Sequence, residues 1–180
     1  MTNRFQTHDV LGRDVTFELS GTWTGYWVAM LRLVTGYWFF HAGLTKYANL
    51  WYAGAEPFSA TGWLTGATQG TIVAPVTVWA GNTIPWFVNL VIPFAEVAIG
   101  LALMLGVLVR FAAFWGAFLM AFFYFGNAGW AHGFVNGDLM ALLLFVTLIV
   151  LGAGRVMGLD AYLEETDLVR NHPRLKYLLG

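Results

Sequence analysis

Four long apolar stretches dominate the chain and are separated by a tight turn or by more polar segments. They cover about residues 26–46, 86–108, 110–127 and 138–154. A helix needs about twenty mostly apolar residues to cross the hydrocarbon core of a bilayer, which is roughly 30 Å thick. The pattern therefore predicts an all-α integral membrane protein, built as a bundle of four transmembrane helices.

The remaining segments differ from one another in character. Residues 47–85 are rich in Trp, Tyr and branched apolar residues, which favours a structured outer loop of short helices broken by turns. Residues 1–25 are polar and have no apolar core typical of a cleavable signal peptide, so we expect a retained cytoplasmic tail. Residues 155–180 suit a cytoplasmic amphipathic helix that ends near the helix-breaking Pro173.

The composition excludes several classes of protein. Hydrophobic residues make up 58% of the chain and charged residues only 11%, whereas about a quarter of the residues in a soluble domain are charged. A net charge of −1 without a basic cluster disfavours nucleic acid as a partner. The absence of cysteine excludes disulfides, thiolate metal sites and Cys nucleophiles.

The distribution of basic residues predicts an orientation in the membrane. With four spans both termini share one side, and seven basic residues are expected there: Arg4, Arg13, Arg110, Arg155, Arg170, Arg174 and Lys176. Only Lys46 is expected on the opposite side. Because cytoplasmic flanks carry the excess of Lys and Arg, we expect a plasma-membrane protein with both termini in the cytoplasm.

Arg32 and Glu96 are the charged residues inside the predicted spans. Each costs at least ~2.5–3.5 kcal/mol at membrane depth, so each needs a partner or water. Counted from the inner edges, Arg32 lies roughly 9 Å deep and Glu96 roughly 18 Å deep, a gap that the long Arg side chain can mostly close. We therefore expect an Arg32–Glu96 ion pair. It acts either as a catalytic proton relay and polar ligand site or only as a packing contact between helices.

One face of the first predicted helix carries charge at both ends and little bulk in its middle. Arg32, Gly36, Phe39, Gly43 and Lys46 recur at helical spacing along this face. The space above the glycines suits either a flat ligand or a closely packed neighbouring helix.

Polar residues gather where the outer ends of the spans are expected. His41, Lys46, Asn127 and His132 are candidate ligands for a quinone head group, which needs hydrogen-bond donors at its carbonyls and a proton path. The alternative is that they form structural hydrogen bonds and cap helix ends. A bis-histidine haem is disfavoured because only His41 and His132 are expected near the membrane, and no clustered ligands support a metal site.

The spacing of charged and small residues resembles the DoxX/DoxD family. The residues that carry the resemblance are Arg32, Gly36, Phe39, Gly43, Lys46, Pro93, Glu96, Gly100, Gly106, Arg110 and Ala113. The resemblance implies a small four-helix membrane protein, and in the DoxD branch the membrane subunit of thiosulfate:quinone oxidoreductase. It also implies that Arg32, Lys46, Glu96 and Arg110 matter for function. Since the chain has no cysteine, any thiosulfate chemistry would need a partner subunit or outer-sphere binding.

Two function hypotheses follow from the sequence. The first is a quinone-linked oxidoreductase subunit that works with the quinone pool and a second subunit. The alternative is a non-enzymatic membrane scaffold that docks a partner through its outer aromatic loop. Small-solute transport is weaker, because four short spans without inverted repeats offer little alternating-access machinery. A small-residue face at Ala113, Gly116, Ala117 and Ala121 is suited to close helix packing, within the chain or in a homo-oligomer.

Overall fold

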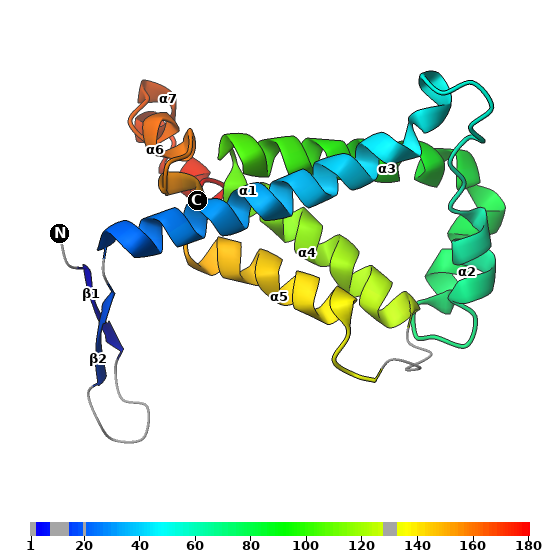
Figure 1. Ribbon diagram of the computed structural model, residues 1–180, viewed down its shortest axis with the longest axis horizontal. Helices are drawn as coiled ribbons and strands as arrows, with labels where there is room; N and C mark the ends of the chain where they lie inside the picture. Colours follow the sequence, from blue (N-terminus) through cyan, green and yellow to red (C-terminus); the bar gives the residue numbers. More distant parts are fainter. Residues whose placement is uncertain (1–2, 8–14, 20, 128–132) are drawn as a thin grey trace.

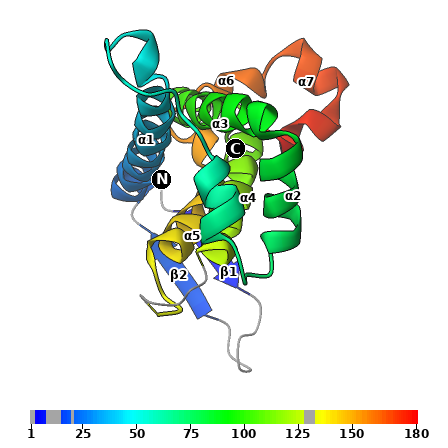
Figure 2. The same ribbon diagram turned by 90° about the vertical axis from the view of Figure 1, so that its right-hand side faces the viewer.

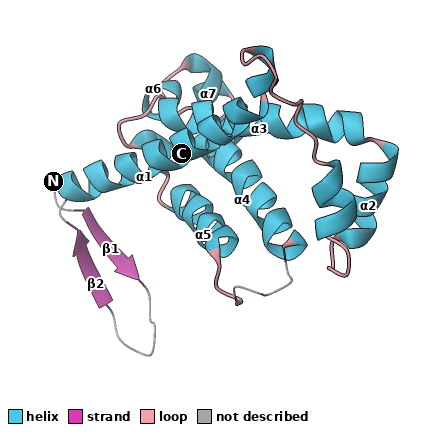
Figure 3. Ribbon diagram, turned by 45° about the vertical axis from the view of Figure 1, so that its right-hand side comes forward, coloured by secondary structure: helices cyan, strands magenta, loops and turns pink. Residues whose placement is uncertain are grey.

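The computed structural model describes residues 3–7, 15–19, 21–127 and 133–180, and these are mainly helical (Figures 1 and 3). Four long helices within the described part form the bundle: α1 (Gly21–Lys46), α3 (Pro85–Leu105), α4 (Val109–Gly126) and α5 (Gly137–Val150). Before them, β1 (Asn3–Thr7) pairs antiparallel with β2 (Val15–Leu19). The sequence did not predict this hairpin, because it reads there as a polar tail.

Short elements gather at the two ends of the bundle (Figures 1 and 2). At the end we name the loop end lie η1 (Ala48–Leu50), η2 (Trp63–Ala67) and α2 (Ala74–Thr83). At the opposite, terminal end lie η3 (Ala153–Arg155), α6 (Asp160–Leu163), α7 (Asp167–Asn171) and η4 (Pro173–Tyr177). The expected structured loop over 47–85 is therefore present, whereas the expected C-terminal helix is divided into several short pieces.

The bundle consists of two helix pairs joined by a shared core. Helix α1 packs along α3, and α4 packs along α5. Phe39 of α1 meets Phe145 of α5 edge to face, with ring centroids 4.6 Å apart, and this contact links the two pairs. Leu103, Ala113 and Leu148 are also buried in this core. The turn between α3 and α4 uses a left-handed Gly106, which suits a residue without a Cβ.

Helices α1 and α3 approach each other so closely that their backbones touch at glycines. A Cβ placed on Gly43 would lie 2.8 Å from the Pro93 carbonyl oxygen, and one on Gly36 would lie 2.9 Å from the Gly100 carbonyl oxygen. The open face of the first helix is thus filled by a neighbouring helix rather than by a flat ligand. This resolves the alternative that the sequence left open, and it fixes how α1 and α3 align along their lengths.

The predicted boundaries agree with most helices to within a few residues and differ at two places. Helix α1 begins at residue 21 rather than 26, because two glycines and two threonines in residues 21–25 weaken the helical signal. The last helix ends at Val150, and its 14 residues span about 21 Å. By length and composition, α3 and α4 are the helices of the described chain that suffice to cross a membrane.

The small-residue face of α4 packs inside the chain. Gly116 lies against the ring of Phe145, which leaves no space for a Cβ, and Ala113 and Ala117 are buried beside it. Close packing was correctly predicted for this face. Because α5 covers it, it does not serve as the homo-oligomer interface considered from the sequence.

We predict that Gly100→Ala lowers the free energy of unfolding by about 1–3 kcal/mol, because the added methyl overlaps the α1 backbone at Phe40 and at the Gly36 carbonyl oxygen. Thermal unfolding in detergent, followed by circular dichroism, measures the change. Gly62→Ala is the matched control, since Gly62 has right-handed helical dihedrals and open space around it. Equal melting of both variants would contradict the close α1–α3 contact.

Candidate functional site

An ion pair between a half-buried lysine and a buried glutamate joins α1 and α3 near the loop end of the bundle. Lys46, the last residue of α1, donates from Nζ to Glu96 Oε2 at 2.6 Å and also to the Ala42 carbonyl oxygen at 3.2 Å. Glu96 is only 4% exposed. Because Gly43 lets α1 touch α3 at Pro93, the end of α1 comes close enough for the lysine to reach the carboxylate. A charge-assisted hydrogen bond of this kind partly offsets the cost of burying both groups.

The expected Arg32–Glu96 ion pair is wrong. Arg32 is 2% exposed, and its Nη atoms donate to the carbonyl oxygens of Ala153 (3.2 Å) and Met157 (3.0 Å) at the terminal end. The glycine contacts align α1 with α3 so that the Arg32 guanidinium lies against Gly106, at the end of α3. Counting the depth of each residue from the edges of the predicted spans could not reveal this alignment. Lys46, and not Arg32, is the ion-pair partner of Glu96.

The surroundings of Arg32 include a buried carboxylate that organises the terminal end. Asp160 is fully buried and accepts hydrogen bonds from the backbone N–H groups of Leu108 (2.7 Å), Val109 (3.0 Å) and Gly180 (2.8 Å). Two of these donors lie at the start of α4, where a helix has unpaired N–H groups. Asp160 therefore caps α4 from a distant part of the chain. Sequence analysis did not single it out, because nothing in its local pattern marks it as a cap for residue 109.

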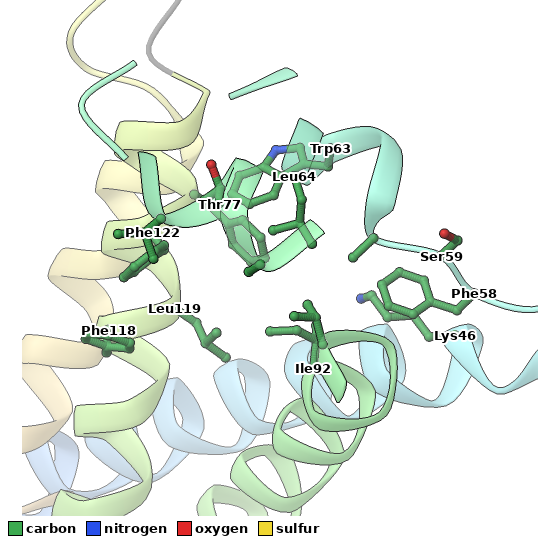
Figure 4. A pocket seen from close by; sticks show the side chains of 15 residues that line it. Lys46, Phe58, Ser59, Trp63, Leu64, Thr77, Ile92, Phe118, Leu119 and Phe122 are labelled. Atoms are coloured by element: carbon green, nitrogen blue, oxygen red, sulfur yellow. The ribbon is translucent and has the colours of Figure 1, made fainter. Parts of the chain in front are cut away.

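An apolar cavity of about 340 Å³ lies beside the Lys46–Glu96 pair (Figure 4). We call it the loop-end cavity. Lys46 lies at one side of it, next to Phe58, whose ring centroid is 5.5 Å from Nζ. The other labelled lining residues are Ser59, Trp63, Leu64, Thr77, Ile92, Phe118, Leu119 and Phe122. They come from α3, α4 and the loop over residues 47–85, so the loop that was expected to be structured forms one wall of the cavity.

A second apolar hollow lies between α3 and α4, next to the loop-end cavity. This hollow, the α3–α4 groove, has a volume of about 600 Å³ and shares Ile92, Phe118 and Leu119 with the cavity. Its lining includes the partly exposed aromatic residues Phe111 and Trp115. The site thus combines the Lys46 cation, the Glu96 carboxylate and two neighbouring apolar hollows. This combination suits a ligand with a small polar head and a lipophilic tail.

Comparison with protein-family models gives a match to DoxX over residues 27–133, more than half of the chain. The chain belongs to the DoxX family. DoxX proteins are membrane-associated, and some members are linked to quinone oxidoreductases. No curated protein and no solved structure matches the chain. The matched range contains Lys46, Glu96 and every residue that lines the loop-end cavity.

The other predicted quinone ligands are His41, Asn127 and His132, and neither of the two that the structure describes lines the loop-end cavity. His41 is exposed, contacts the ring of Tyr37 at 5.9 Å between centroids, and does not line the loop-end cavity. Asn127 does not line the cavity, but it holds the lining residue Trp63 in place. Its Oδ1 accepts a hydrogen bond from Trp63 Nε1, and its Nδ2 donates one to Asp138 Oδ2, each at 2.9 Å. His132 lies outside the described residues.

Several residues of the cavity were missed by sequence analysis. Phe58, Trp63 and Thr77 belong to the loop that was expected to be structured, but no local signal showed that it folds over α3 and α4. The hydrogen bond from Ala60 N to Asn89 Oδ1 (2.8 Å) and the Trp63–Asn127 bond hold it there. Both are long-range contacts, which a single sequence does not reveal.

We predict that Asp160→Asn destabilises the protein by about 1–3 kcal/mol for each backbone donor that loses its acceptor, because the amide nitrogen cannot accept. It also removes the negative charge near the buried Arg32 guanidinium. Chemical denaturation in detergent measures the effect. Asp167→Asn, on an exposed residue of α7, should change stability by only a few tenths of a kcal/mol. Similar losses in the two variants would contradict the capping role.

Proposed function

We propose that this DoxX protein is the membrane subunit of a quinone-linked oxidoreductase, and that its loop-end cavity binds the quinone head group. The observation that carries the proposal is the ion pair of Lys46 with the buried Glu96, at the edge of an aromatic cavity that shares wall residues with an apolar groove. The membership in a family with quinone-linked members supports it.

The chemistry of a quinone suits the groups at the cavity. A quinone carbonyl accepts hydrogen bonds, and the Lys46 ammonium is a donor on the cavity wall, beside the face of Phe58. Reduction to the quinol adds electrons and protons in equal number, with a proton going to each carbonyl oxygen. In this proposal Glu96 passes protons through Lys46, with which it shares a 2.6 Å hydrogen bond. The aromatic rings of Trp63 and Phe122 offer stacking surfaces for the flat head.

The electrons come from a partner subunit in this proposal. Thiosulfate is the substrate suggested by the resemblance to the DoxD branch, and its oxidation would release the electrons that the quinone takes up. The chain has no cysteine to carry a sulfur intermediate, so the proposal assigns the sulfur chemistry to the partner and the quinone to this subunit.

The α3–α4 groove suits the isoprenoid tail of the quinone. Its lining is almost wholly aliphatic and aromatic, and Phe94, Phe111 and Trp115 at its edge are partly exposed, as expected for side chains that face lipid. A quinone would enter from the bilayer through this groove and place its head beside Lys46.

The proposal includes four membrane spans with both termini in the cytoplasm of the cell. Helix α1 has 26 residues and is long enough to cross a bilayer, whereas the 14 residues of α5 reach only part of the way and end at a left-handed Gly152. The excess of basic residues at the terminal end supports this orientation.

A second candidate function is a scaffold that docks a partner through the loop end. The exposed Trp51, Tyr52, Ile72 and Trp79 favour it, since aromatic residues are enriched at protein interfaces. The two functions are separable, because quinone binding needs the cavity whereas docking needs only the outer surface.

We predict that Glu96→Gln and Lys46→Met each weaken binding of a short-chain quinone analogue by roughly ten- to a hundredfold, the loss expected for a charge-assisted hydrogen bond. Quenching of tryptophan fluorescence in purified protein reports binding, and Trp63→Phe identifies the signal that comes from the cavity. Ala80→Phe, which fills the cavity without changing a charge, should also prevent binding.

His41→Ala is the control for this experiment, because His41 is exposed and lies outside the cavity lining. Its affinity for the analogue should equal that of the unaltered protein. Unchanged affinity in the Glu96, Lys46 and Ala80 variants would remove the quinone proposal and leave the scaffold function.

The orientation predicts a labelling pattern that the absence of native cysteine makes easy to measure. In intact cells a membrane-impermeant maleimide should label Ile72→Cys at the loop end, and it should label Leu168→Cys at the terminal end only after the membrane is permeabilised. Both positions are exposed. Labelling of residue 168 in intact cells would show that the orientation is reversed.

A further inference from the structure

Four basic side chains converge at the terminal end, away from the loop-end cavity. Arg110, Arg155, Arg174 and Lys176, together with Pro173 and Tyr177, line an open hollow of about 440 Å³. We call it the basic groove. Its cations come from three separate segments, the start of α4, η3 and η4, which only the fold brings together. The sequence predicted basic residues on this side but no cluster.

The contacts in the basic groove leave most of its positive charge unneutralised. Arg155 pairs with Glu164 at 2.7 Å. Arg110 donates from Nε to the carbonyl oxygen of Ile149 at 3.3 Å, which fixes its guanidinium without neutralising it. Throughout the described part of the chain, Arg110, Arg174 and Lys176 have no carboxylate within ion-pair distance. The start of α4 is capped by Asp160 and adds nothing to this charge, so the guanidinium and ammonium groups alone supply it.

A cluster of cations with this geometry suits a phosphate group. Arginine donates in a planar fork that matches phosphate oxygens, and lysine adds a flexible point charge. The cations surround a common hollow instead of being spread over a solvated face, so several of them can contact one anion together.

Exposed apolar residues at the same end of the bundle favour a lipid as the source of that phosphate. Val150, Leu151 and Met157 lie within five residues of Arg155 in sequence and are 73%, 47% and 70% exposed. Tyr177, which lines the groove, is 78% exposed. A free phosphate ion would gain nothing from these side chains, whereas a phospholipid would cover them with its acyl chains.

We propose that the basic groove binds the phosphate headgroup of an anionic phospholipid, with its acyl chains lying against the exposed apolar residues of the terminal end. The site is independent of the proposed quinone site, since the two share no lining residue.

Native mass spectrometry of the full chain in detergent, titrated with phosphatidylglycerol and separately with phosphatidylcholine, tests the proposal. Phosphatidylglycerol should bind more tightly, and Arg174→Ala and Lys176→Ala should each weaken it by about fivefold, the contribution of one basic residue near an anionic lipid. Both residues are exposed and make no hydrogen bond through their side chains that the fold needs. Their variants should therefore fold normally.

Arg170→Ala is the matched control, because it removes the same charge from an exposed residue of α7 outside the basic groove. It should leave the affinity unchanged. An equal loss in the Arg170 and Arg174 variants would overturn the proposal, since attraction would then reflect overall charge. Displacement of phosphatidylglycerol by inorganic phosphate at a comparable concentration would identify a free-phosphate site and overturn the lipid assignment. The Arg174 and Lys176 variants should bind the quinone analogue as the unaltered protein does. Failure of the lipid proposal can therefore be told apart from failure of the proposed quinone function.

Discussion

The contact between the backbones of α1 and α3 is the constraint on which the other features depend. Gly36 and Gly43 of α1 meet Gly100 and Pro93 of α3 at distances that leave no room for a Cβ. Two helices packed this closely can hardly slide along each other, because any shift would bring side chains into the contact. The contact therefore sets Lys46 beside Glu96 at one end and Arg32 beside Gly106 at the other. The position of Lys46 and Glu96 at the cavity and that of the buried Arg32 at the other end therefore both follow from the same alignment of α1 with α3.

Sequence periodicity was sufficient to find the long helices but not to align them. Apolar runs of helical length marked α3 and α4 to within about three residues, since burial in an apolar environment shapes composition directly. The glycines on the first helix were also recognised as a place for close approach. Which residue of α3 meets each glycine depends on packing across the chain, and for that reason the buried Glu96 was assigned the wrong cation.

In the candidate site, too, some residues could be recognised from the sequence and others could not. Glu96 was recognised because charge in an apolar helix is costly, and Lys46 and Asn127 because they lie at the ends of spans. The aromatic wall was not recognised, since Trp63 and Phe58 lie in a connecting segment whose position is decided by single long-range hydrogen bonds such as Trp63 to Asn127. His41 is exposed and does not line the cavity, because the direction in which a helix residue faces depends on how the helix packs and not only on its position along the span.

The contacts of Arg32 also bear on where the physical unit of this protein ends. The family match stops at residue 133, yet the carbonyl oxygens that receive the Arg32 guanidinium belong to Ala153 and Met157, and the nearby carboxylate is that of Asp160. A fragment cut at the family boundary would leave the buried Arg32 guanidinium without its hydrogen-bond acceptors and the start of α4 without its cap. The segment that follows the family match is therefore part of the packing of the helices before it, and its contacts with them extend as far as Gly180.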